Sequence, residues 1–331
     1  MIGNVLKQLF LAFVLFLAGV ASPLQEKEIR RLPYADVMEE AARLHQKAGE
    51  LIKAEKLRRG AELAEEDIWG IGIMGPHYTS LTTTSGGLEE KRTSQLPDFA
   101  ALCVKYYMEA GLEKGDRVGA NFSGSYPGLN LAALCAAEVM GLDFVYTSSV
   151  GSSTYGANCP EYTFPEMLKT LFEAGLISKM PGMITLGGGG DMGRNMAGYV
   201  LEDEEWIREI ETMKERLIAE GLAYESIESY AQDIALHEAL YGEIRLFVNA
   251  GGNSLALGGN DEVILALESG LLLPREMSVN ERSGLVERYL DRGIPVVHLL
   301  SVRDLCAKGI SFNPDRPPEI GTSPLYFEIM P

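Results

Sequence analysis

The stretch Gly115–Asn130 constrains the fold most, because it joins a strand pattern, a tight turn and a helix pattern. Residues Arg117–Phe122 form a short run bounded by glycine, which is typical of a buried strand, and Leu129–Met140 are rich in Ala and Leu, which favour helix. Pro127 suits the first helical position, and Ser125 is expected to be the N-cap. The helix would aim free N–H groups at the strand end, where an anion could bind; a plain tight turn is the alternative.

The same alternation of short strand patterns and amphipathic helix patterns continues along the chain. The expected strands are Thr79–Thr83, Arg117–Phe122, Asp143–Ser148, Met183–Leu186, Ile244–Asn249 and Pro295–Leu300. The expected helices are Asp98–Ala110, Leu129–Met140, Phe164–Ala174, Asp203–Ala219, Ser226–Leu240 and Ser283–Arg292. This order predicts an α/β fold with right-handed crossovers, in which a mostly parallel open sheet carries helices on both faces.

Loops of small residues follow four of the expected strands. They are Ser123–Ser125, Ser148–Ser153, Gly187–Arg194 and Asn249–Ser254. Because the carboxyl ends of parallel strands share one edge, and because Gly and Ser let a ligand approach the backbone, these loops predict a binding site. Gly188–Gly193 fits only the bare Gly-x-Gly-x-x-Gly pattern and lacks a convincing acidic ribose partner downstream, so we expect no nucleotide cofactor.

The N-terminal region predicts targeting. An apolar run, Leu9–Ala21, follows Lys7, and its length fits a signal peptide; counted from Val5, it could instead span a bilayer as an uncleaved anchor. We therefore expect residues 1–22 to be a signal peptide or single membrane anchor, with the body outside the cytoplasm. Residues 23–68 hold an Ala-rich helical pattern, predicted to be a stalk or alternatively a helix packed on the body. A composition change places the α/β domain at 69–331.

Charge and cysteine content exclude some classes of function. The formal net charge of −18 argues against a sequence-independent nucleic-acid binder, which needs clustered Lys and Arg. The four cysteines form no CxxC pair and lie at no zinc-site spacing from histidine, so no metal site is expected. Disulfides stay possible in an exported chain, but no pairing is selected.

Several ordered blocks carry a family resemblance. They are Thr82–Ser94 with Pro97–Ala101, Phe122–Asn130, Ser148–Ser152 with Tyr155–Asn158 and Pro160–Glu161, Leu186–Asp191 with Gly193–Arg194, and Gly293–Asp304. Together they resemble the poly-gamma-glutamate system protein family over nearly the whole chain from about Gly70. The resemblance implies an accessory protein of poly-gamma-glutamate synthesis or export, held at the membrane by its N-terminal segment. It implies gamma-glutamyl chains and membrane-bound synthase or export subunits as partners, and it carries no catalytic assignment.

A gamma-glutamyl chain bears one carboxylate per residue, so a protein of net charge −18 must hold it through local cations and N–H groups. The candidate ligand-binding residues are Lys91, Arg92, Thr93, Ser94, Ser123, Gly124, Ser125, Ser149, Gly188, Gly189, Gly190, Arg194, Asn249, Gly251, Gly252 and Arg303. For single arginines the alternative is a local ion pair, Arg194 with Asp191 or Arg303 with Asp304.

Catalysis is the alternative to binding. Ser123 stands at a strand end before a glycine and a helix, and His298 with Asp191 or Asp304 could complete a triad. This would be a serine-dependent hydrolase or amide transferase acting on gamma-glutamyl linkages. The positions two residues before and after Ser123 hold Asn and Ser, however, where a nucleophile elbow has glycine. His298 lies in an expected strand, where a core histidine is more common than a base. A third hypothesis is an assembly subunit that only contacts membrane partners.

Overall fold

The computed structural model describes residues 28–259, 263, 266–312 and 316–330, and the chain divides into two compact units. In the smaller unit, strand β1 (Ile29–Arg31) pairs antiparallel with β8 (Phe327–Ile329). The larger unit is Pro33–Tyr326. The expected signal peptide or anchor, residues 1–22, lies outside the described residues. Within the part that is described, no helix has the length and apolar character needed to cross a bilayer.

A six-stranded sheet forms the centre of the larger unit, with strand order β4-β3-β2-β5-β7-β6. Its parallel strands are β2 (Arg117–Phe122), β3 (Asp143–Ser149), β4 (Met183–Thr185), β5 (Leu246–Ala250) and β7 (Val296–Leu299). The edge strand β6 (Gly270–Leu272) runs antiparallel to β7. The predicted α/β class and mostly parallel sheet are confirmed.

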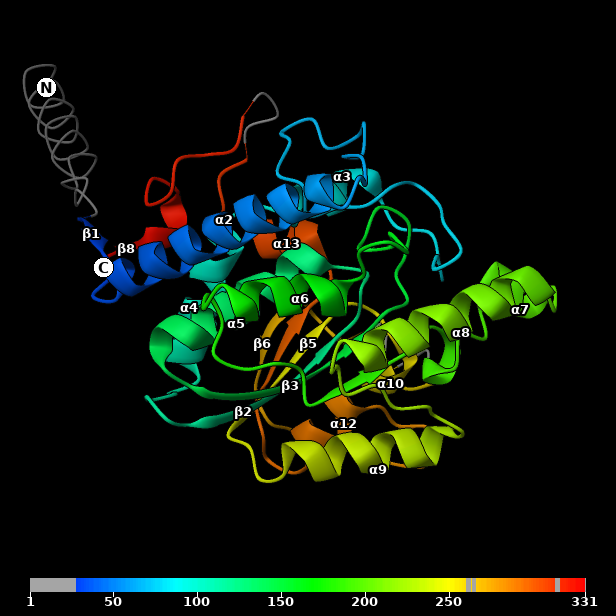
Figure 1. Ribbon diagram of the computed structural model, residues 1–331. Coiled ribbons are helices and arrows are strands. Elements are labelled where there is room, and N and C mark those ends of the chain that lie inside the picture. The colour runs from blue at the N-terminus through cyan, green and yellow to red at the C-terminus, as the bar shows by residue number, and fades with distance from the viewer. Residues whose placement is uncertain (1–27, 260–262, 264–265, 313–315, 331) are drawn as a thin grey trace, which may run out of the picture. The chain divides into compact units, whose positions relative to one another are not determined.

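Helices cover both faces of this sheet (Figure 1). One face carries α2 (Ala35–Arg58), α4 (Asp98–Glu109), α5 (Pro127–Met140) and α6 (Phe164–Glu173). The other carries α9 (Tyr230–Tyr241) and α12 (Leu285–Asp291). The further helices are α3 (Leu88–Thr93), α7 (Ala197–Val200), α8 (Glu204–Ala219), α10 (Ser254–Leu257), α13 (Val302–Cys306) and the 3₁₀ turns η1 (Gly189–Asp191) and η2 (Pro324–Tyr326).

Of the two expectations for the helical pattern within residues 23–68, a stalk or a helix packed on the body, helix α2 agrees with the second. It ends at Arg58, and it packs against α4 and α5 within the larger unit. Its inner face buries Met38, Ala41, Ala48 and Ile52, each at most 1% exposed. The small alanine side chains let the helix lie close to its neighbours, so the Ala-rich pattern reflects packing on the body.

Other boundaries also differ from expectation. Thr79–Thr83 forms no strand, because its backbone makes a turn (Thr82 N–H to the Thr79 carbonyl, 3.1 Å) and only one isolated bridge, from Thr82 to Ser152. Helix α9 starts at Tyr230 rather than Ser226, since the Ser229 side chain caps it by accepting the Gln232 N–H. Strand β6 was not predicted. The four cysteines are free thiols.

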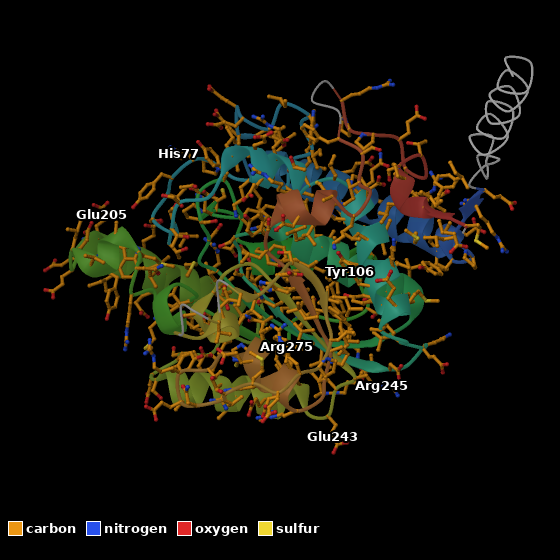
Figure 2. The ribbon with its side chains drawn as sticks, turned by 180° about the vertical axis from the view of Figure 1, so that it is seen from behind. His77, Tyr106, Glu205, Glu243, Arg245 and Arg275 are labelled. Atoms are coloured by element: carbon orange, nitrogen blue, oxygen red, sulfur yellow. The ribbon has the colours of Figure 1, made fainter. Side chains whose placement is uncertain are left out.

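The surface of the larger unit carries charges of both signs. Glu205, Glu243, Arg245 and Arg275 are exposed, whereas the Tyr106 ring is buried (Figure 2). With a net charge of −18, acidic groups outnumber basic ones, and a polyanion approaching the protein meets long-range repulsion.

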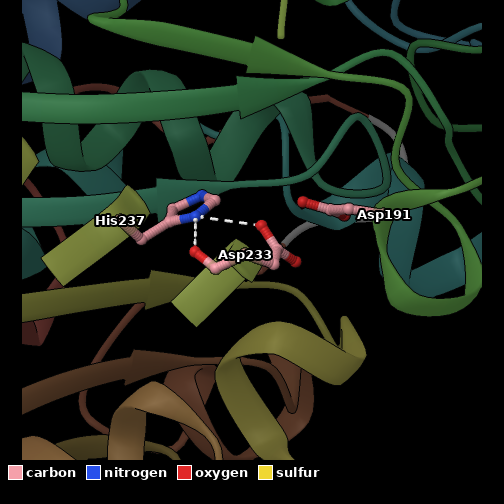
Figure 3. A group of neighbouring side chains, drawn as sticks. All are labelled: Asp191, Asp233 and His237. Carbon is pink, nitrogen blue, oxygen red and sulfur yellow. Dashed lines mark hydrogen bonds and ion pairs between the residues drawn. The ribbon is translucent and has the colours of Figure 1, made fainter. Parts of the chain in front are cut away.

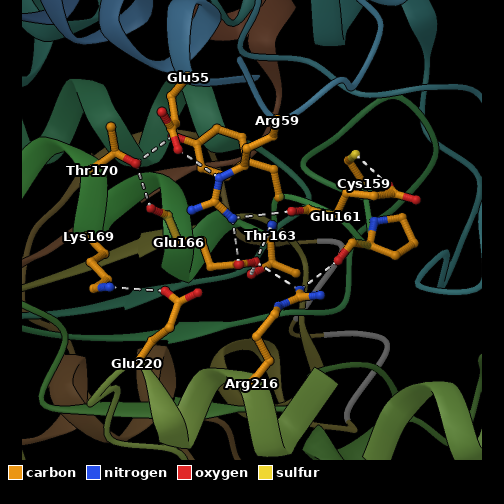
Figure 4. Close-up of polar contacts among 12 residues, drawn as sticks. Glu55, Arg59, Cys159, Glu161, Thr163, Glu166, Lys169, Thr170, Arg216 and Glu220 are labelled. Atoms are coloured by element: carbon orange, nitrogen blue, oxygen red, sulfur yellow. Dashed lines mark hydrogen bonds and ion pairs between the residues drawn. The ribbon is translucent and has the colours of Figure 1, made fainter. Parts of the chain in front are cut away.

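A buried carboxylate joins three helices on one face of the unit. Glu166, in the first turn of α6, accepts hydrogen bonds from Arg59 Nη1 (2.9 Å), which follows α2, and from Arg216 Nη2 (3.1 Å) on α8 (Figure 4). The backbone N–H (2.8 Å) and hydroxyl (2.7 Å) of Thr163 also donate to it, which closes a capping box. The Glu166 side chain is 0% exposed, so each of these donors replaces lost water.

Replacing Glu166 with Ala should lower the free energy of unfolding by about 3 kcal/mol, because it removes the capping box and leaves Arg216 without its carboxylate, while Arg59 keeps Glu55 (2.8 Å). Urea denaturation measures the loss. Glu173→Ala, on the same helix but 63% exposed, should change stability by no more than about 0.5 kcal/mol. Equal losses in the two variants would contradict this account of the network.

Candidate functional site

A cavity of about 440 Å³ opens at the carboxyl edge of the sheet, where the predicted loops meet. Its walls are mainly hydroxyl side chains, glycines and amides. The lining residues are Thr83, Thr84, Ser85, Gly86, Lys91, Ser123, Ser125, Tyr126, Ser149, Gly151, Ser153, Gly188, Gly189, Asn195, Gly252, Asn253, Ser254, Leu257, Gly258 and Leu300. The convergence of loops that follow β2, β3, β4 and β5 agrees with the sequence-based expectation.

Backbone hydrogen bonds hold these loops against one another. The Thr83 N–H donates to the Ser152 carbonyl (2.8 Å), and the Gly151 N–H donates to the Leu186 carbonyl (2.8 Å). The Ala157 N–H donates to the carbonyl of Gly124 (2.8 Å). A Cβ atom on Gly124 would lie 2.9 Å from the Gly151 carbonyl oxygen, so this glycine permits loop packing. The cavity walls are therefore fixed by main-chain contacts.

Lys91, on α3, is a basic residue of the cavity wall. It is 2% exposed, its Nζ donates to the Ser125 carbonyl, and it lies 3.4 Å from the centroid of the Tyr126 ring. Burial lowers the pKa of Lys91 to about 7, and the nearby Glu90 carboxylate partly opposes this shift. Glu90 itself accepts a hydrogen bond from the Tyr126 hydroxyl (3.1 Å).

The cavity wall differs in charge from the protein as a whole, whose net charge is −18. Of the described residues that line it, Lys91 alone has a basic side chain. An incoming carboxylate would meet this amine together with the hydroxyls of Ser123, Ser125 and Ser153, and none of the described wall residues is acidic. Charge-assisted hydrogen bonds of this kind are the stronger ones in proteins.

A larger cavity of about 630 Å³ lies elsewhere, between α2 and the segments around Trp69 and Pro317. It is lined by charges of both signs, including Arg43, Glu50 and Glu319, and not by the loops at the strand ends. For a site that must select anions, the smaller cavity is better suited because the described residues of its wall include no carboxylate.

Seven of the predicted ligand-binding residues line the cavity: Lys91, Ser123, Ser125, Ser149, Gly188, Gly189 and Gly252. The expected helix cap at Ser125 is wrong, since Tyr126 is the N-cap of α5 and makes no side-chain cap bond. The Ser125 hydroxyl instead accepts the Ser153 N–H (3.0 Å), which ties two loops together.

The other predicted ligand-binding residues do not line the cavity. The Arg92 guanidinium donates to the Glu66 carbonyl (2.8 Å), Thr93 is buried, and the Ser94 hydroxyl donates to the Lys91 carbonyl (2.8 Å).

Gly190 donates its N–H to Ser254 Oγ (3.1 Å), Asn249 donates to the Gly251 carbonyl (2.9 Å), and Gly124 packs between loops. Arg194 and Arg303 are exposed, and neither makes its expected local ion pair within the described ranges.

Ser123, His298 and Asp191 are not brought together as a triad. Ser123 lines the cavity, and its Oγ accepts the Ser125 N–H at 3.4 Å. His298, on β7, contacts Asn249 Nδ2 through Nδ1 (3.0 Å), and burial lowers its pKa to about 4, which keeps it neutral. Asp191 accepts a hydrogen bond from the Thr185 hydroxyl (2.9 Å). No hydrogen bond links these three side chains in the described part of the chain.

Sequence reasoning missed two groups of residues. Residues 83–86 form a wall of the cavity, and the available signal was a run of hydroxyl residues that precedes the α3 helix. Asp233 and His237 lie beside Asp191, and their signal was an Asp-x-x-x-His spacing, which places both side chains on one helix face.

Comparisons with known proteins found no match for this chain among family models, curated proteins or solved structures.

Lys91→Met should change how stability depends on pH. In the unfolded chain Lys91 has an ordinary pKa near 10.5, and in the folded chain a pKa of about 7. Between these values the unfolded chain binds more protons, so this group makes the free energy of unfolding rise with pH, by at most about 1.4 kcal/mol per pH unit. Urea denaturation from pH 7 to 9 should show wild type gaining stability relative to Lys91→Met.

The exposed Lys114 supplies the control for this measurement. Lys114→Met removes the same charge, and its stability difference from wild type should stay constant across the same pH range. A constant difference for Lys91→Met as well would mean that the Lys91 amine titrates normally.

Proposed function

We propose that this protein is a membrane-associated accessory protein of poly-gamma-glutamate synthesis or export, and that its cavity binds carboxylates of the gamma-glutamyl chain. One observation carries the binding part: Lys91 has the only basic side chain among the described residues of the cavity wall, and none of them is acidic. The sequence blocks that resemble the poly-gamma-glutamate system family support the choice of polymer. The apolar run Leu9–Ala21 supports attachment or targeting to a membrane.

Local charge can outweigh the acidic surface at this position. Exposed charges are screened over about 8–10 Å at physiological salt, while a buried amine interacts with a bound carboxylate at much lower effective dielectric. No carboxylate lines the cavity among the described residues, although Glu90 lies near Lys91. A bound carboxylate would therefore give the amine a direct partner and would raise the pKa of Lys91 again. A net charge of −18 therefore does not prevent local binding of an anion.

The size and chemistry of the cavity limit what can enter. About 440 Å³ is within the usual range of small-ligand sites, so it suits a short gamma-glutamyl segment rather than a folded polymer domain. The hydroxyls of Ser123, Ser125 and Ser153 can donate to the remaining carboxylate and amide oxygens. Other segments of the chain would remain outside, available to synthase or export subunits.

Serine-dependent cleavage or transfer of gamma-glutamyl linkages is the second candidate function. The observation that favours it is that the Lys91 amine, with a pKa of about 7, lies in the same cavity wall as six serines, Ser123 among them. A neutral Lys91 could take the proton of a serine hydroxyl as its oxygen attacks the gamma-amide carbonyl, and could then return it to the leaving amine. Water or a second amine would release the acyl group.

Deleting the gene in a polymer-forming host should lower or abolish gamma-linked polyglutamate at the cell surface. Complementation should restore the polymer with wild type or Lys114→Met and fail with Lys91→Met, because only the last removes the cavity amine. Polymer amount and chain length give the measurement. Unchanged polymer after deletion would overturn the proposed role, and full rescue by Lys91→Met would overturn the site.

The enzyme hypothesis makes a separate prediction. If Ser123 is the nucleophile, wild-type protein should shorten gamma-glutamyl oligomers or transfer them to an added amine, and Ser123→Ala should keep the fold but lose this turnover. Mass spectrometry of the oligomers measures both reactions. Ser80→Ala, outside the cavity, is the control. Turnover that is absent in wild type, or unchanged in Ser123→Ala, would contradict this hypothesis.

A further inference from the structure

Three side chains of the types that bind metal ions lie close together near the glycine-rich loop that follows β4 (Figure 3). Asp191 comes from η1, and Asp233 and His237 come from adjacent turns of α9. One ligand atom from each lies within 4.8 Å of the others. All three side chains are buried, with exposures of 3%, 0% and 1%.

Asp233 is an unsatisfied buried acid. Among the described residues, neither of its carboxylate oxygens receives a hydrogen bond. Its Oδ1 lies 3.1 Å from His237 Nδ1, but the hydrogen bond of that nitrogen runs to the Asp233 carbonyl oxygen (2.9 Å). A buried carboxylate without donors is costly, and a second carboxylate, Asp191, faces it.

The negative charge of the two facing carboxylates must therefore be compensated at this point. Basic side chains do not compensate it, because no Lys or Arg forms an ion pair with Asp191 or Asp233 in the described part of the chain. The Thr185 hydroxyl satisfies one oxygen of Asp191 (2.9 Å), and Asp233 has no equivalent donor. The carboxylates can share a proton, or they can hold a cation.

We propose that Asp191, Asp233 and His237 bind a divalent transition-metal ion such as Zn²⁺ or Mn²⁺. Two carboxylate oxygens and one imidazole nitrogen form a donor set that suits these ions, whereas Mg²⁺ and Ca²⁺ prefer oxygen alone. Water molecules would complete the coordination.

The geometry requires only local adjustment. Ligand atoms around a tetrahedral zinc with bonds of about 2.0 Å lie about 3.3 Å apart, so a cluster within 4.8 Å must contract by small side-chain rotations. If His237 binds through Nδ1, its proton must move to Nε2 and its contact with the Asp233 carbonyl must loosen. Asp233 and His237 are one helical turn apart, so α9 presents both on one face.

A bound metal would connect η1 to α9. Gly188 and Gly189, just before Asp191, line the cavity, and the Gly190 N–H donates to Ser254 Oγ, which also lines it (3.1 Å). The ion would therefore fix one wall of the cavity. The metal site itself does not depend on what the cavity binds.

The test uses purified full-length protein that is stripped with a chelator, dialysed and titrated with Co²⁺ as a spectroscopic substitute for Zn²⁺. We expect one bound Co²⁺ per chain with a visible absorption band. Zn²⁺ or Mn²⁺ should raise the melting temperature, because the ion binds the folded state. Elemental analysis of the protein before stripping identifies the resident ion.

Asp233→Asn and His237→Gln should each weaken Co²⁺ binding at least tenfold, whereas Glu228→Gln, an exposed acid just before α9, should not change it. Without metal, Asp233→Asn should melt at or above the wild-type temperature, because it removes one of two facing carboxylates. With metal it should melt below wild type. Folded wild-type protein that takes up no stoichiometric metal would overturn the proposal, as would unchanged binding in both variants.

Discussion

Backbone contact between loops at one edge of the sheet is the constraint on which the site depends. The parallel strands end together, and the loops that follow them exchange N–H to carbonyl hydrogen bonds across short gaps. Glycine makes these short distances possible: a Cβ atom on Gly124 would lie 2.9 Å from the Gly151 carbonyl oxygen. Because main chain rather than large side chains fills this edge, the cavity that remains is lined by hydroxyls, amides and glycines.

The same packing explains how an amine is buried there. Lys91 extends from α3 to the Ser125 carbonyl and the Tyr126 ring, so its ammonium has partial partners, but the described residues of the cavity wall offer it no carboxylate. Burial costs the charged form enough to lower the pKa of Lys91 to about 7. A bound carboxylate would offset this cost, and for this reason a buried amine without a carboxylate partner favours the binding of an anion.

Local periodicity was sufficient to predict the five parallel strands of the sheet and the loops at its edge, because Arg117–Phe122 and its equivalents carry strand patterns followed by small residues. It did not predict the antiparallel edge strand β6. Long-range contacts were not predictable in this way. Residues 79–83 turn instead of forming a strand, and α2 packs on α4 instead of standing as a stalk. His298 and Asp191 face different partners, Asn249 and Thr185, because the sheet register and the η1 turn set their directions. Lys91 was predicted to bind the ligand, but its burial could not be predicted because it depends on tertiary structure.

Calorimetry with short gamma-linked glutamate oligomers tests whether the Lys91 cavity binds gamma-glutamyl carboxylates, as proposed. We expect saturable binding to wild type that is at least tenfold weaker in Lys91→Met and unchanged in Lys114→Met. We also expect weaker binding as pH rises above about 7, where the Lys91 amine of the free protein becomes neutral. Equal affinity in wild type and Lys91→Met, or no binding to wild type, would contradict the proposal.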